Sequence, residues 1–345
     1  MNSSRWESGW RWLRWPLALG VLGWLIIPHL DDLRELVQQG IRWQWLIAAL
    51  MLRSASLAVT GARWNLLLSS QGIHPPASRV ARIVGVGYVC NFILPGTVGG
   101  DVAKAGLIVA DTPERRKRAL ATVPLDRAIG LLAFLLLGTL AGLLRWPLIP
   151  SPVLRSAVVV MSAISLSGLL SLLFVLLSKS FHYREASNGE DDAVGILQKL
   201  MQALRRGTSI LQRARGAVLT ALLLSLLGHL CLCSASYSCL QAFRAADLPI
   251  TWSDQLWLVP AAEVPAAFLA LPGGLGAREG ALAYFYGEFA SDPALIERYR
   301  GIGVLVGGTY SIVCITLAVL VGLALAAGGP SRESAPAGFP ETSGQ

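Results

Sequence analysis

Residues 94–101 read Leu-Pro-Gly-Thr-Val-Gly-Gly-Asp and interrupt a long apolar region of the chain. Pro95 removes a backbone donor and clashes with the preceding turn, and the three glycines lower helix stability further, so an unbroken helix is excluded here. Inside a lipid bilayer, the freed backbone groups must find partners within protein or in a wet cavity. The stretch therefore predicts a break in a membrane segment that is buried among other helices.

The same pattern occurs again at residues 271–278, which read Leu-Pro-Gly-Gly-Leu-Gly-Ala-Arg. Every matched position lies 177 residues after its counterpart, so Gly99 corresponds to Gly276 and Asp101 to Arg278. Two apolar segments that Gly and Pro interrupt in corresponding halves are the best sequence indication of a transporter's binding site. The alternative is that two unrelated loops share these residues by chance.

The composition is that of a polytopic helical membrane protein. Of the 345 residues, 54% are hydrophobic and only 14% are charged, and the mean hydropathy is +0.55. No polar stretch is long enough to bury a core of its own, so no separate soluble domain is expected. The net charge is +8, and the basic residues fall in loops between apolar runs. There they are expected to orient the chain in the membrane and to contact anionic lipid rather than nucleic acid.

Apolar runs of roughly 20 residues predict about six membrane spans. The first run ends near Ile27, and the others cover about residues 43–61, 125–144, 154–178, 217–243 and 301–327. The first run is followed by Pro28, His29 and two acids without a small-residue cleavage site, so we expect a retained span rather than a signal peptide.

The segment around the first interruption has basic residues on both sides, Arg79 and Arg82 before it and 115–118 after it. Neither half is long enough to cross a bilayer alone. Because cytoplasmic loops carry an excess of Lys and Arg, both flanks are expected in the cytoplasm, and the segment is interpreted as a re-entrant hairpin. A single kinked span is the alternative. The second interrupted segment, about 255–290, would then enter from outside, as an inverted repeat requires.

The chain is thus expected to be an all-α integral membrane protein with a single transmembrane domain at residues 1–327 and both termini in the cytoplasm. Residues 179–215 form a basic loop that predicts an amphipathic helix on the inner leaflet, or a helix that packs on neighbouring loops. Residues 328–345 are rich in Gly, Pro, Ser and Thr, which predicts a disordered tail.

Several polar residues lie within or beside the expected spans. Arg53 either extends to the membrane surface or faces the protein interior. The adjacent Asp126-Arg127 either decorates the interface or closes the mouth of a cavity. Ser225, His229 and Ser236 share one helix face, where they line a polar cavity or join helices together.

The cysteines and histidines do not indicate a disulfide framework or a metal centre. All five cysteines lie in apolar stretches, where they behave as small hydrophobic residues. His229 and Cys233 are one helical turn apart, but two candidate ligands do not make a metal site. No metal and no cofactor are expected.

Two stretches of the chain resemble a known family. Residues 91–96 (Asn-Phe-Ile-Leu-Pro-Gly) with 99–101 (Gly-Gly-Asp) resemble the first signature of the flippase-like transmembrane domain of lysylphosphatidylglycerol synthases. Residues 271–279 are similar to its second signature, and Arg63-Trp64 and Asp126-Arg127 also stand where that family has similar residues. The resemblance covers nearly the whole chain, about residues 12 to 327.

This resemblance implies that the chain moves a lipid-linked substrate. The full synthases join the membrane domain to a cytoplasmic aminoacyl-transferase domain, which this sequence lacks, so lysyl transfer is not implied. The family often has an acid and an Arg after the first break, whereas this chain has Asp101 and Lys104. Because Lys cannot clamp a phosphate in the bidentate manner of Arg, the identity of the headgroup stays open.

The chemistry is expected at the two breaks, where half-helix N-termini offer N–H groups and a positive dipole to an anionic headgroup. Lys104 and Arg278 would add charge, and Asp101 and Glu279 would pair with them when the site is empty or contact an aminoacyl or amino headgroup. The alternative is that these four charges only join the hairpins together. The candidate substrate-binding residues are Asn91, Pro95, Gly96, Gly99, Gly100, Asp101, Lys104, Arg127, Glu263, Pro272, Gly273, Gly276, Arg278 and Glu279.

The function predicted from these features is the flipping of an anionic lipid or lipid-linked intermediate across the cytoplasmic membrane of a bacterium. The alternatives are an intramembrane transferase that acts on a lipid-linked substrate and a membrane scaffold for a separate lipid-modifying enzyme. No catalytic motif favours an enzyme. Membrane lipids are the expected partners, nucleic acid is not, and the oligomeric state stays open.

Overall fold

The computed structural model describes residues 40–93, 99–177, 214–243, 248–268 and 272–327, and two isolated positions before them. This part of the chain is helical and contains no strand, which confirms the expected fold class. The expected first span, the break at 94–98, the loop before Ala214 and the tail after Ala327 lie outside the described residues.

Five of the described helices are long and apolar enough to cross a membrane, and they confirm five of the six expected spans. They are α3 (Trp43–Ser70), α6 (Arg116–Leu144), α7 (Pro152–Leu177), α9 (Arg215–Ala242) and α12 (Ile296–Ala327). Helix α6 begins well before the expected position 125, because its basic first turn continues the helix beyond the apolar run. Asp126 and Arg127 therefore lie inside this helix rather than at its beginning.

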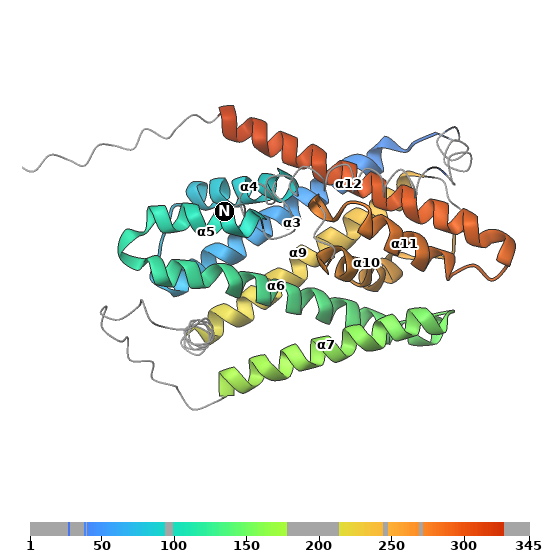
Figure 1. Ribbon diagram of the computed structural model, residues 1–345, viewed down its shortest axis with the longest axis horizontal. Helices are drawn as coiled ribbons and strands as arrows, with labels where there is room; N and C mark the ends of the chain where they lie inside the picture. The colour runs from blue at the N-terminus through green and yellow to red at the C-terminus, as the bar shows by residue number, and fades with distance from the viewer. Residues whose placement is uncertain are drawn as a thin grey trace, which may run out of the picture.

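Both interrupted segments are helical hairpins rather than kinked spans (Figure 1). The first consists of α4 (Ala77–Ile93) and α5 (Gly99–Asp111), and the second of α10 (Trp252–Phe268), the short η4 (Pro272–Gly274) and α11 (Ala277–Gly287). An ion pair of 2.6 Å joins Arg79 at the start of α4 to Asp111 at the end of α5. Gln255 near the start of α10 donates to the hydroxyl of Tyr286 near the end of α11. In each segment the chain thus returns to the end from which it came.

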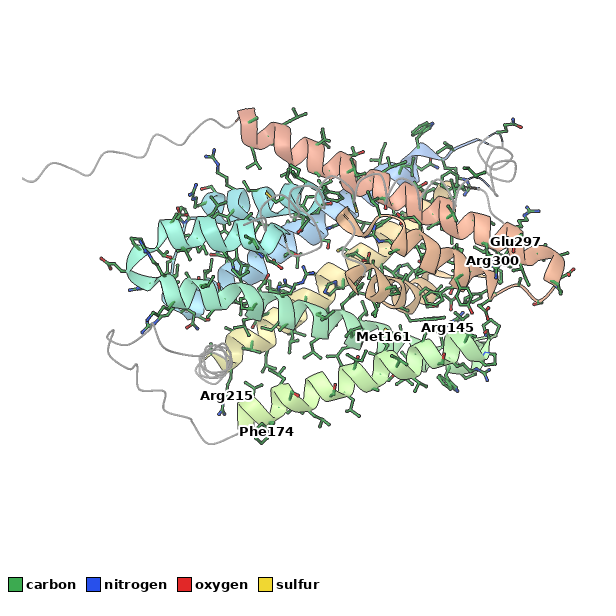
Figure 2. All side chains as sticks on the ribbon, viewed as in Figure 1. Arg145, Met161, Phe174, Arg215, Glu297 and Arg300 are labelled. Carbon is green, nitrogen blue, oxygen red and sulfur yellow. The ribbon has the colours of Figure 1, made fainter. Side chains whose placement is uncertain are left out.

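The two ends of the helix bundle differ in charge. One of them, the basic end, carries Arg79, Arg82, Arg115, Arg116, Lys117, Arg118 and Arg215. Figure 2 shows Arg215 at this end and Arg145, Glu297 and Arg300 at the opposite end. The first hairpin opens toward the basic end and the second toward the opposite end (Figure 1).

The two halves of the chain repeat one unit in opposite directions. A long helix, a hairpin and another long helix follow one another as α3, α4–α5 and α6, and again as α9, α10–α11 and α12. The backbone N–H of Arg42 donates to the carbonyl of Ala242 over 3.0 Å, so α3 begins where α9 ends. The helices of the pair are antiparallel, as an inverted repeat requires.

The two hairpin tips meet inside the bundle. The ring of Phe92, at the end of α4, packs against Gly273 of η4, whose φ of +59° suits glycine. Asp101 precedes Asp111 by ten residues, and Arg278 precedes Glu288 by ten. At 1.5 Å per residue, each lies about 15 Å below the mouth of its hairpin, near the middle of a hydrocarbon layer about 30 Å thick.

Candidate functional site

Three charged side chains from three helices form the first cluster. Arg63 of α3, Lys104 of α5 and Asp126 of α6 are all buried. Arg63 Nε donates to Asp126 Oδ1 over 2.7 Å, and Lys104 Nζ donates to Asp126 Oδ2 over 3.1 Å. One carboxylate therefore faces two basic groups, which leaves an excess of one formal positive charge inside the membrane-spanning part.

Polar and aromatic neighbours hold the two cations in place. Arg63 Nη1 donates to Ser225 Oγ over 2.9 Å. Lys104 Nζ lies 4.8 Å from the centre of the Trp64 ring, and Trp64 Nε1 donates to Thr122 Oγ1 over 3.2 Å. The cluster is thus built where α3, α5, α6 and α9 meet.

A second pair of charges connects this cluster to the outer surface of the bundle. Arg127 Nη1 lies 3.5 Å from Asp101 Oδ2, and the two side chains are 49% and 22% exposed. Their neighbours Val102 and Leu131 are exposed apolar side chains. A charged patch between α5 and α6 therefore emerges on a surface that is otherwise suited to lipid.

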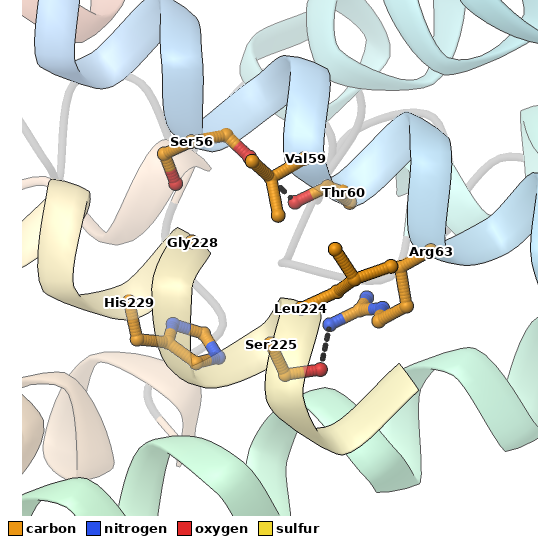
Figure 3. Close-up of a pocket in the computed structure, with 8 residues that line it drawn as sticks. All are labelled: Ser56, Val59, Thr60, Arg63, Leu224, Ser225, Gly228 and His229. Carbon is orange, nitrogen blue, oxygen red and sulfur yellow. Dashed lines mark hydrogen bonds between the residues drawn. The ribbon is translucent and has the colours of Figure 1, made fainter. Parts of the chain in front are cut away.

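On the other side of Arg63, a small cavity of about 10 Å³ lies between α3 and α9 (Figure 3). It is lined by Ser56, Val59, Thr60, Arg63, Leu224, Ser225, Gly228 and His229. Its volume is about that needed for one water molecule. The expected polar face of α9 is thus divided: Ser225 and His229 line the cavity, whereas Ser236 donates to Gln255 of α10.

The second cluster surrounds the second break and is fully connected by hydrogen bonds. Arg278 donates through Nε to Glu263 over 2.5 Å, through Nη1 to Ser311 Oγ over 3.2 Å and through Nη2 to the carbonyl of Gly273 over 3.1 Å. Glu279 accepts from the backbone N–H of Gly276 over 2.6 Å and from Ser311 Oγ over 2.5 Å. This network clamps η4 and the start of α11 against α12.

Arg53 faces the interior beside this second cluster, which decides between the two orientations that the sequence left open. Its guanidinium lies 4.9 Å from the centre of the Tyr88 ring, and that of Arg278 lies 5.2 Å from the centre of the Tyr310 ring. The Nε of Arg53 is buried and has no hydrogen-bond partner in the described part of the chain.

The predicted partners of the charges at the breaks are wrong. Lys104 pairs with Asp126, and Arg278 pairs with Glu263, while Asp101 pairs with Arg127. Asp101 and Arg278 belong to different clusters, although their places in the two repeats correspond. Each tip packs on the neighbouring helices of its own half, and these supply the counter-charge.

The two half-helix N-termini are also less open than expected. The side-chain oxygen of Asn91 accepts from the N–H of Gly100 over 2.8 Å, and Glu279 accepts from the N–H of Gly276. These caps satisfy donors that the sequence analysis left free for a substrate. Pro95 and Gly96 lie outside the described residues, whereas Gly99 is buried at the start of α5.

Sequence reasoning left Arg53, Arg63, Asp126 and His229 out of the candidate site. The sequence did carry a signal for the three charged residues, because a charge inside a membrane is costly and marks a functional site by default. His229 carried only a weak signal, since a polar residue on a spanning helix is often a helix–helix contact. In the described residues, no three His, Cys, Asp or Glu side chains are grouped to hold a metal ion.

A family model described as the lysylphosphatidylglycerol synthase TM region matches residues 12–296. The chain belongs to this family. A search among curated proteins finds no match. Family membership and the five apolar helices show a multi-pass membrane protein with a function related to membrane lipids.

Proposed function

We propose that this chain moves an anionic lipid or lipid-linked intermediate between the leaflets of the cytoplasmic membrane of a bacterium. The observation that carries the proposal is the charge balance of the first cluster, in which Asp126 is the one carboxylate among the described residues that forms ion pairs with Arg63 and Lys104. In a low-dielectric interior, an uncompensated positive charge attracts an anion far more strongly than it does in water. A phosphate headgroup supplies that missing negative charge.

The exposed pair at Asp101 and Arg127 gives the headgroup a lateral way to the cluster. Arg127 lies nine residues into the helix from Arg118, about 13 Å deeper in the membrane. A headgroup that meets Arg127 between α5 and α6 leaves its acyl chains in lipid beside Val102 and Leu131. Lys104 and Arg63 are the next basic groups toward the interior of the bundle. The headgroup therefore meets charged partners at a depth where hydrocarbon alone would make its burial costly.

The distribution of basic residues supports an orientation with the basic end in the cytoplasm. Helix α12 ends at this side, so the C-terminal segment after Ala327 would be cytoplasmic, and we propose the same side for the N-terminus. The first hairpin then enters from the cytoplasm and the second from outside. A separate lipid-modifying enzyme would provide the lipid to the cytoplasmic leaflet.

The test is reconstitution into liposomes that carry a fluorescent lipid in both leaflets, with an impermeant quencher added outside. The protein should raise the quenchable fraction above the protein-free half. Asp101→Asn should abolish the rise, because it breaks the only ion pair described for Arg127. Asp111→Asn, which breaks a pair with Arg79 at the mouth of the same hairpin, is the matched control and should leave the rise intact.

A panel of fluorescent lipids gives the outcome that contradicts the proposal. It contains an anionic, a zwitterionic and a polyprenyl-phosphate lipid, and an ion gradient is imposed. If all three stay at the protein-free fraction while the protein is folded, flipping is wrong. An intramembrane transferase or a scaffold would then account better for the fold.

A further inference from the structure

His229 has a defined tautomer in which one ring nitrogen is left open. Nε2 lies 2.9 Å from the carbonyl oxygen of Gly130, and a carbonyl oxygen only accepts, so the neutral ring carries its hydrogen on Nε2. The ring stacks on Phe134, with the ring centres 4.5 Å apart. Nδ1 is therefore an acceptor, and it is buried without a hydrogen-bond partner among the residues that the structure describes.

The cavity beside His229 has polar residues in its lining, with Ser56 and Thr60 on α3 and Ser225 on α9. Figure 3 shows the His229 ring on the α9 side of the cavity, across from Ser56 of α3. Arg63 of α3 reaches across to α9 and donates to the hydroxyl of Ser225. A buried acceptor beside a space of about one water molecule can take a proton that arrives through that space.

Charged groups reach His229 from the helices that pack against α9. Helix α3 contributes Arg63 and, further away, Arg53, which both act on the imidazole electrostatically. Helix α6 contributes Asp126, one turn before Gly130, but both oxygens of this carboxylate are engaged by Arg63 and Lys104. When no headgroup is bound at the first cluster, a proton on His229 thus adds a second uncompensated positive charge.

We infer that His229 is a proton-binding site that is loaded together with the anionic headgroup, so that transport is coupled to protons. The proton adds to the lone pair of Nδ1, while Nε2–H keeps its bond to the carbonyl of Gly130. The inference rests on the proposed function, because the anion is what makes the added charge tolerable. A proton and a headgroup of single negative charge then move as a neutral pair.

The coupling is reciprocal. A headgroup beside Arg63 and Lys104 cancels the excess charge and favours protonation of His229, and protonation in turn strengthens binding of the headgroup. We expect an affinity difference of about tenfold between acidic and alkaline pH, which is typical of two coupled sites.

The experiment titrates the purified chain, in nanodiscs of zwitterionic lipid, with short-chain phosphatidylglycerol at pH 5.5 and pH 8. Calorimetry in buffers of different ionisation enthalpy counts the protons taken up with each lipid. The wild type should bind about tenfold more tightly at pH 5.5 than at pH 8, and it should take up protons, up to one per lipid, at the acidic pH. His229→Gln keeps a side-chain N–H donor for Gly130 but cannot titrate, so its affinity should not change with pH. His74→Gln, at an exposed position near the basic end, is the matched control and should behave as the wild type.

Each other result overturns the inference in a recognisable way. If the wild type binds with equal affinity at both pH values and takes up no proton, His229 is not a proton site and the transport proposal stands. If the affinity of His229→Gln still changes with pH, His229 is likewise not the proton site, and the transport proposal stands. If the wild type binds no phosphatidylglycerol at either pH, both the inference and the anionic site fail. The proton count needs no variant, so it decides even if His229→Gln does not fold.

Discussion

Asp126 is the residue on which the charge balance of the first cluster depends. Its two oxygens accept separately from Arg63 and Lys104, and all three side chains are buried. Removing one partner of a buried ion pair leaves a charge without compensation, which costs far more than the pair itself contributes. The carboxylate therefore makes the site stable enough to exist while leaving one positive charge for a substrate.

Asp126→Asn should lower the free energy of unfolding by about 3–5 kcal/mol, because it leaves two buried cations unpaired. Thermal and denaturant unfolding of the detergent-purified chain measure this loss. Asp111→Asn, at the partly exposed pair with Arg79, should cost at most about 1 kcal/mol. Adding Lys104→Met to Asp126→Asn should restore part of the loss. Equal effects of Asp126→Asn and Asp111→Asn would show that the first cluster is not a buried charge network.

Asp101 and Arg278 should respond differently to neutralisation, although they occupy corresponding places in the two repeats. Arg278→Gln removes a guanidinium with three hydrogen-bonded partners and should lower the melting temperature. Asp101→Asn changes a partly exposed pair without a close hydrogen bond and should leave melting nearly unchanged while it stops transport. If Asp101→Asn melts as early as Arg278→Gln, Asp101 is a structural residue.

The sequence predicted Asp101, Lys104 and Arg278 as site residues because they stand near the two breaks, and Arg127 because Asp126-Arg127 stands where the family has similar residues. It did not predict their partners. Arg63 and Asp126 are 63 residues apart, and only the packing of α3 on α6 brings them together. The positional match of the two repeats does not extend to the partners, because each counter-charge comes from a helix whose rotation about its axis the sequence does not determine.

At the scale of the elements, the Pro/Gly motifs were sufficient to predict two hairpins. The start of α6 was not predictable in the same way. Arg116, Lys117 and Arg118 look like a cytoplasmic loop, and Pro124 looks like a helix end, yet the helix includes all of them. Basic side chains at a helix end can extend to the headgroups, so a spanning helix continues beyond its apolar run.

Close backbone contacts hold the second hairpin against α12, and glycine permits them. A Cβ on Gly303 would lie 2.7 Å from the Cα of Ala283 and from the carbonyl oxygen of Leu282. Gly303→Ala should therefore destabilise the fold by about 1–3 kcal/mol through overpacking.

Gly308→Ala on the same helix is the matched control, because no other described helix comes within 4 Å of its added Cβ. It should be neutral or gain up to about 1 kcal/mol, since alanine favours the helix. Thermal unfolding of the two variants decides the question. Equal melting temperatures would mean that α11 and α12 do not pack as closely as described.

At the scale of the molecule, the inverted arrangement gives two hairpins with different roles. The second hairpin is held by a closed network at Arg278 and Glu279. The first has a partly exposed charge pair at its tip and an excess positive charge behind it. The composition and the two motifs were enough to predict a polytopic helical fold and the two hairpins, whereas this asymmetry arises from side-chain partners and needed the three-dimensional structure.

Topology can be tested with single cysteines at Ser78, Arg115 and Ser291 in a background without the native cysteines. Ser78 and Arg115 lie at the basic end, and Ser291 lies at the opposite end. In intact cells, an impermeant thiol reagent should label only the cysteine at 291. Labelling of either the cysteine at 78 or that at 115 without the other would rule out a hairpin between them.

The most direct test of the central claim measures how fast a fluorescent anionic lipid crosses the bilayer of liposomes that contain the Arg127→Gln or the Arg145→Gln variant. Both variants neutralise a partly exposed Arg that pairs with an Asp, but Arg145 pairs with Asp254 away from the proposed path. The account predicts that Arg127→Gln slows crossing by at least about tenfold, which corresponds to at least about 1.4 kcal/mol of added barrier, and that the lipid crosses at the wild-type rate with Arg145→Gln. Equal rates for folded Arg127→Gln and wild type would contradict a headgroup path between α5 and α6.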